Sequence, residues 1–108
     1  MSNDNSDILE RLYAVIESRQ GADASSSYSA KLFAAGLPEI ARKVGEEAVE
    51  TITAALSGEG DVTAESADLL YHLLVLWAAA GIKPEDVWTE LARREGTSGI
   101  EEKNSRGK

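Results

Sequence analysis

The chain has 108 residues, with 11 Lys and Arg against 19 Asp and Glu, so its formal net charge at pH 7 is −8. It contains no Cys and one His, which excludes disulfides and cysteine metal clusters and disfavours zinc sites and Ser-His-Asp triads. The acidic balance argues against nucleic acid as the main partner, because phosphates attract basic surfaces.

The hydrophobic fraction of 43% is typical of a globular protein, and the length allows one domain. Residues 1–7 lack the basic and apolar pattern of a secretory signal. The most apolar run, residues 69–82, is too short to span a bilayer. We therefore expect a cytoplasmic protein that does not bind membranes.

The first half of the chain contains two predicted helices. Apolar residues from Ile8 to Ile16 recur at helical spacing, and Gly21 ends this first helix. Residues 22–27 are small and polar, which is typical of a loop. A short helix is predicted over residues 28–35.

Two long helices are predicted next, joined by a short turn. Pro38 suits the first turn of a helix in which apolar residues recur every four positions until Gly58 ends it. Asp61 or Thr63 can cap the following helix, which is apolar almost all round and ends at Gly81. A helix of that kind is expected to lie at the centre of the fold.

The last predicted helix begins near Pro84, with acidic residues in its first turn. The fold class is therefore an all-α bundle of four or five helices, with a domain over residues 7–95. Residues 96–108 are predicted to form a flexible, charged C-terminal tail. Residues 69–77 carry more apolar surface than a small monomer covers, so we expect a homodimer.

Two pairs of acids stand at three-residue spacing on the two long helices. Glu47 and Glu50 share one helix face, and Glu65 and Asp68 repeat the spacing after the turn. Helices joined by so short a turn pack antiparallel, which allows the two pairs to face each other. Converging carboxylates repel one another unless a cation binds between them. Because the chain has a single His, Mg²⁺ or Mn²⁺ is favoured over iron or zinc at such a site. The alternative is an ordinary solvated acidic face.

Two other residues near these acids each have two interpretations. Lys43 precedes Glu46 by three residues and Glu47 by four. It can pair with either acid, or contact a substrate phosphate beside the metal. His72, four residues after Asp68, is either a base or partner of the site or, more commonly for such a residue, a hydrogen-bonded core histidine.

The acidic segments 43–50 (KVGEEAVE) and 65–72 (ESADLLYH) resemble the phosphoribosyl-ATP pyrophosphohydrolase family of histidine biosynthesis. Segment 27–29 (SYS) is similar to the Ser-Tyr-Thr of that family, with Ser29 in place of the usual Thr. Segments 36–43 and 94–103 also resemble the family pattern, so the resemblance covers roughly residues 7–106.

The resemblance implies a MazG-like, dimeric all-α pyrophosphohydrolase with sites near the subunit interface. It implies Mg²⁺-dependent hydrolysis of phosphoribosyl-ATP to phosphoribosyl-AMP and pyrophosphate, the second step of histidine biosynthesis. Carried over by position, the Mg²⁺ ligands would be Glu47, Glu50, Glu65 and Asp68. The residues taking part in catalysis would be Glu46, Glu47 and Lys43, with Lys43 also contacting phosphate. Weaker candidates for substrate contacts or subunit closure are Ser27, Tyr28, Arg94, Ser98 and Lys103.

Two alternative functions stay open at this point. One is a housecleaning pyrophosphohydrolase of the same fold that acts on another nucleoside triphosphate. The other is a non-catalytic helical interaction module whose acids are only a solvated surface. The acidic motif is shared within the fold, so the flanking segments are what favour the histidine-pathway enzyme.

Overall fold

Helices form all the regular secondary structure in the residues that the computed structural model describes, 7–96 and 99–106. They are α1 (Ile8–Ser18), α2 (Tyr28–Ala35), α3 (Leu37–Ser57), α4 (Val62–Ala80), α5 (Pro84–Arg94) and α6 (Gly99–Ser105). The all-α prediction is confirmed. Within those described residues, no helix combines the length and the apolar character needed to cross a membrane.

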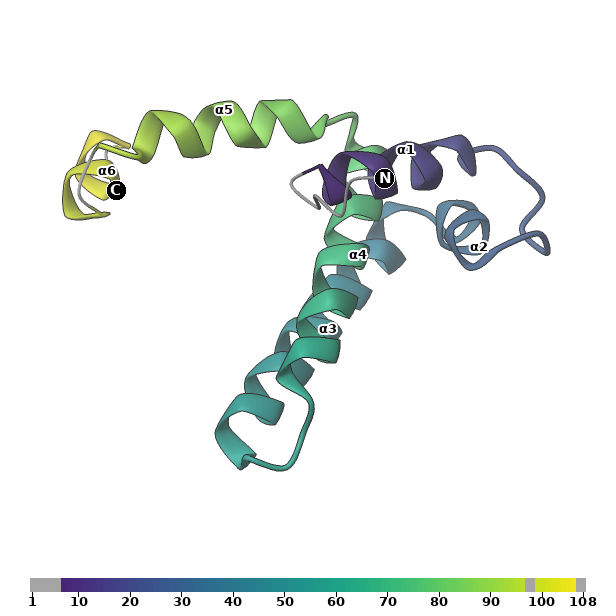
Figure 1. Cartoon of the computed structure of the whole chain (residues 1–108). Coiled ribbons are helices and arrows are strands. Elements are labelled where there is room, and N and C mark those ends of the chain that lie inside the picture. Colours follow the sequence, from purple (N-terminus) through teal and green to yellow (C-terminus); the bar gives the residue numbers. More distant parts are fainter. Residues whose placement is uncertain (1–6, 97–98, 107–108) are drawn as a thin grey trace, which may run out of the picture.

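The longest feature of the molecule is the antiparallel pair of α3 and α4 (Figure 1). Gly58 ends α3 with a φ of 72°, a left-handed conformation that glycine adopts without a steric cost. Asp61 caps α4 by accepting a hydrogen bond of 3.0 Å from the Ala64 N–H. Between them, a Cβ added to Gly60 would lie 2.5 Å from the Ala54 Cβ, so this close approach requires glycine. The turn thus fixes which residues of α3 and α4 face each other.

The hydrophobic core lies at the end of the α3–α4 pair that is farther from this turn, where α1 and α2 cross it (Figure 1). Helix α4 contacts α1, α2 and α3, as expected for its nearly all-round apolar surface. The buried cluster consists of Tyr13, Ile16, Leu32, Ile40, Leu74, Val75 and Ala78. The acids lie in the middle of the α3–α4 pair, and the buried cluster packs against only one end of that pair.

Helices α5 and α6 extend away from the α3–α4 pair (Figure 1). The first half of α5 is attached to the rest of the molecule through Trp88, whose ring meets Trp77 of α4 edge to face at 5.9 Å. The Trp88 indole N–H also donates to the Glu10 carboxylate of α1. Helix α6 lies within the segment for which composition predicted a flexible tail.

Candidate active site

Glu47 is the residue at which the acids of α3 and α4 meet. One carboxylate oxygen each from Glu47, Glu65 and Asp68 lie within 4.8 Å of one another. The same is true of Glu46, Glu47 and Glu50 along α3. The spacing correctly predicts that Glu47 meets Glu65 and Asp68, whereas Glu50 is grouped only with acids of its own helix. The role of each acid remains a prediction.

Two of these oxygens are buried without a hydrogen-bonding partner. Glu47 is 8% exposed, and its Oε1 and the Oε1 of Glu65 accept no hydrogen bond from the described residues. An unpartnered buried polar atom costs about 1–3 kcal/mol, and more if it is charged. Burial raises the pKa of Glu47, and repulsion from and hydrogen bonding with Glu50 raise it further. Oxygen ligands of this kind suit a hard cation such as Mg²⁺, which would neutralise both carboxylates.

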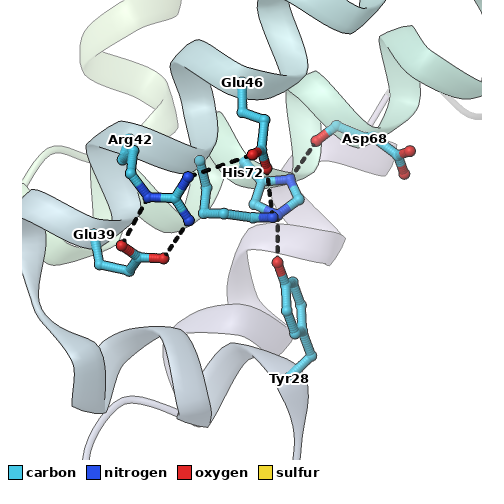
Figure 2. Close-up of polar contacts among 7 residues, drawn as sticks. Tyr28, Glu39, Arg42, Glu46, Asp68 and His72 are labelled. Atoms are coloured by element: carbon cyan, nitrogen blue, oxygen red, sulfur yellow. Dashed lines mark hydrogen bonds and ion pairs between the residues drawn. The ribbon is translucent and has the colours of Figure 1, made fainter.

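Two basic side chains of α3 are bonded to Glu46 (Figure 2). Lys43 Nζ donates to Glu46 Oε1 at 2.8 Å, and Arg42 Nη1 donates to Glu46 Oε2 at 3.3 Å. The hydrogen bond from Lys43, with a smaller contribution from Arg42, lowers the pKa of Glu46. Arg42 also holds Glu39 through two hydrogen bonds of 2.9 and 2.7 Å. Of the two interpretations of Lys43, the structure shows the ion pair, and the phosphate contact remains a prediction.

His72 has both ring nitrogens engaged (Figure 2). Nδ1 lies 2.7 Å from the Asp68 carbonyl oxygen, which can only accept, so Nδ1 carries the proton. In the neutral ring, Nε2 then accepts from the Tyr28 hydroxyl, 2.8 Å away. The side chain is 5% exposed. His72 is thus buried and hydrogen-bonded, as the core interpretation expects. Its two partners are both predicted site residues, so a role of His72 as a partner of the site remains a prediction.

Tyr28 joins α2 to the site without being buried itself. Its side chain is 46% exposed, and its ring stacks on Tyr71 at 6.1 Å and 23° between planes. The Tyr71 hydroxyl is bonded to the Ser29 hydroxyl, so the aromatic pair is fixed from both sides. The position of Tyr28, beside the acids and partly open to solvent, is consistent with its predicted contact with substrate.

Thr51 is a site residue that the sequence analysis missed. Its hydroxyl lies 2.8 Å from the Glu47 carbonyl oxygen and 3.2 Å from the Glu65 carbonyl oxygen. It therefore links the backbones of α3 and α4 directly beside the two unpartnered carboxylates. A hydroxyl four residues after Glu47 on the same helix was the available signal.

The remaining predicted residues lie elsewhere. The Ser27 hydroxyl caps α2 by accepting from the Ala30 N–H at 3.1 Å. Arg94 bonds Glu90 at 3.0 Å on α5, and Lys103 is exposed on α6. These two helices extend away from α3 and α4, so one chain does not bring either cation to the acids (Figure 1). Ser98 lies outside the described residues.

The part of the chain that matches known proteins includes every acid of the cluster. The model of the phosphoribosyl-ATP pyrophosphohydrolase family matches residues 9–95. The chain is 64% identical over 105 residues to the phosphoribosyl-ATP pyrophosphatase of Paramagnetospirillum magneticum, covering 96% of each chain. It is 60% identical over 100 residues to the enzyme of that name from Azospirillum brasilense, covering 92% of this chain and 90% of the relative. For that of Parvibaculum lavamentivorans the identity is 62% over 100 residues, with 92% of each chain covered.

Proposed function

The chain belongs to the phosphoribosyl-ATP pyrophosphohydrolase family, and from this premise we propose that Mg²⁺, held by four carboxylates, supports its hydrolysis of phosphoribosyl-ATP. The products are phosphoribosyl-AMP and pyrophosphate, so the protein is a hydrolase of histidine biosynthesis. The proposed ligands are Glu47, Glu50, Glu65 and Asp68. The observation that carries the metal assignment is the pair of buried, unpartnered oxygens on Glu47 and Glu65. We assign the enzyme to the cytoplasm, as the sequence led us to expect.

The residues around the cluster have chemistry that suits this reaction. Mg²⁺ held there would neutralise phosphate oxygens and would lower the pKa of a water bound to it. Glu46 is kept ionised by Lys43 and Arg42, which makes it a weak base but a good hydrogen-bond acceptor. Its proposed role is to orient the attacking water, and that of Lys43 is to contact the phosphates. No covalent nucleophile is needed, which agrees with a chain that has no Cys.

A homodimer is part of the proposal. Val49, Ile52 and Leu56 follow one another at helical spacing along α3 and are 60%, 56% and 83% exposed. An exposed apolar stripe of this kind favours association with a second copy of the chain. Sedimentation analysis should show a dimer, and a monomer at micromolar concentration would contradict this part of the proposal.

The test of the proposed function is a substrate assay. Pyrophosphate release should be fast from phosphoribosyl-ATP in the presence of Mg²⁺, slow from dUTP and ATP, and absent with excess chelator. Preference for another triphosphate would favour the housecleaning alternative. No turnover of any nucleotide would favour the non-catalytic interaction module.

A further inference from the structure

A pocket lies between α2 and α3, beside the acid cluster. Its volume is about 190 Å³, and its polar lining consists of Tyr28 and Lys31 from α2 with Glu39, Arg42 and Lys43 from α3. Three cations thus stand against one carboxylate, in a chain whose net charge is −8. The excess of positive charge in its lining distinguishes the pocket from the neighbouring acid cluster.

The three cations of this pocket are not equivalent. Arg42 is bonded to Glu39 and Glu46, and Lys43 is bonded to Glu46. The Lys31 ammonium makes no hydrogen bond or ion pair with the residues that the structure describes. Lys31 therefore has all of its hydrogen-bonding capacity available for an anion, whereas the charges of Arg42 and Lys43 are balanced by those of Glu39 and Glu46.

The pocket lies directly next to the acid cluster. Lys43 lines the pocket and bonds Glu46 at 2.8 Å, and a Glu46 oxygen lies within 4.8 Å of oxygens of Glu47 and Glu50. Tyr28 lines the same pocket, with its hydroxyl directed at His72 (Figure 2). A ligand held in the pocket is thus adjacent to a ligand held at the acids.

The proposed substrate has two anionic ends that need different partners. Its triphosphate meets carboxylates and so requires a metal, whereas its phosphoribosyl group ends in a monophosphate that cations can bind directly. Sites for drug-sized molecules start at about 300 Å³, so the smaller pocket suits a pentose phosphate better than a whole nucleotide. We propose that this pocket binds the phosphoribosyl phosphate, and that Lys31 is the residue by which the enzyme distinguishes phosphoribosyl-ATP from ATP. This inference rests on the proposed function.

The experiment compares Lys31→Gln with the unaltered chain in steady-state kinetics at saturating Mg²⁺. Loss of one charge-assisted hydrogen bond should raise the KM for phosphoribosyl-ATP about tenfold, with kcat changed by less than about twofold. The inhibition constant of ATP, which lacks the phosphoribosyl group, should not change. Lys31→Arg should restore most of the KM, and Lys83→Gln, at the start of α5, serves as the matched control without effect.

Two results would overturn the inference. One is an unchanged KM in Lys31→Gln, and the other is a rise in KM matched by an equal rise in the inhibition constant of ATP. Failure of the unaltered chain to hydrolyse phosphoribosyl-ATP would instead contradict the proposed function. Because Lys31 is exposed, its substitution should leave the fold intact, which circular dichroism can verify.

Discussion

Glu47 on α3 and Glu90 on α5 are the same residue type in opposite environments. Glu90 is partly exposed and accepts hydrogen bonds from Arg93 and Arg94, at 2.7 and 3.0 Å for the closest atoms. These bonds lower its pKa to about 2. Glu47 is buried, has an unpartnered oxygen and has a raised pKa. Arg93 and Arg94 balance the charge of Glu90, whereas no cation among the described residues is bonded to Glu47.

We take this difference to separate an acid that serves local stability from one whose proposed role is to bind a cation. A buried carboxylate without a partner opposes folding, so stability alone does not explain its presence. Four further acids share its surroundings, and the Thr51 hydroxyl links the backbones of α3 and α4 beside them. The arrangement makes sense as a cation site whose unfavourable electrostatics are relieved when the ion binds.

The largest expected effect is on catalysis. Glu47→Gln keeps the shape of the side chain and removes its charge, so the rate of pyrophosphate release should fall about a thousandfold. Glu90→Gln, the matched control on α5, should leave the rate unchanged. Equal rates for the two variants would remove the functional distinction between these acids.

The next effect concerns His72, which is buried like Glu47 but has its ring nitrogens paired. His72→Ala should lower the free energy of unfolding by about 2–3 kcal/mol, because it removes packing and hydrogen bonds together. Glu47→Gln should leave that free energy unchanged or raise it, since it removes a buried charge. Urea unfolding at one fixed protein concentration measures both, and strong destabilisation by Glu47→Gln would contradict the account.

A smaller effect is the stabilisation of the fold by Mg²⁺. At ten times its dissociation constant, a ligand that binds only the native state adds about 1.4 kcal/mol. The melting temperature of the unaltered chain and of Glu90→Gln should therefore rise with added Mg²⁺, while that of Glu47→Gln should not. A similar rise in all three would indicate a general salt effect.

The smallest effect is on the acid stability contributed by Glu90. Its pKa is lowered on folding from 4.5 to about 2, so its contribution is present above pH 4.5 and is lost as the pH falls towards 2. Unfolding curves of the unaltered chain and Glu90→Gln should differ slightly at neutral pH and converge at low pH. A difference that grows with acidity would have the wrong sign.

Local rules were enough to predict most of the helices. Gly58 and Gly81 end helices and Asp61 caps one, as their residue types indicate. The meeting of the acids followed from helical spacing and the length of one turn. The sequence did not predict α6, because the Gly and Ser content of residues 96–108 was given more weight than the helix-forming residues 100–103 (IEEK).

The finer features of the site depend on packing between helices, which spacing does not determine. Sequence could not show that Lys43 and Arg42 are engaged by Glu46 while Lys31 is left available. Nor could it show which carboxylate oxygens lose their solvent, because this depends on side-chain conformations where α3 meets α4. The proton position on His72 likewise became known only from its partners.

The central claim is that Glu47 and its neighbours hold a divalent cation. The most direct measurement is electron paramagnetic resonance of Mn²⁺, a stand-in for Mg²⁺ with the same preference for oxygen ligands, titrated into the enzyme with pyrophosphate and phosphoribosyl-AMP present. The account predicts protein-bound Mn²⁺ for the unaltered chain and Glu90→Gln, and a loss of that signal in Glu47→Gln. Binding of Mn²⁺ by Glu47→Gln as tight as in the unaltered chain would contradict it.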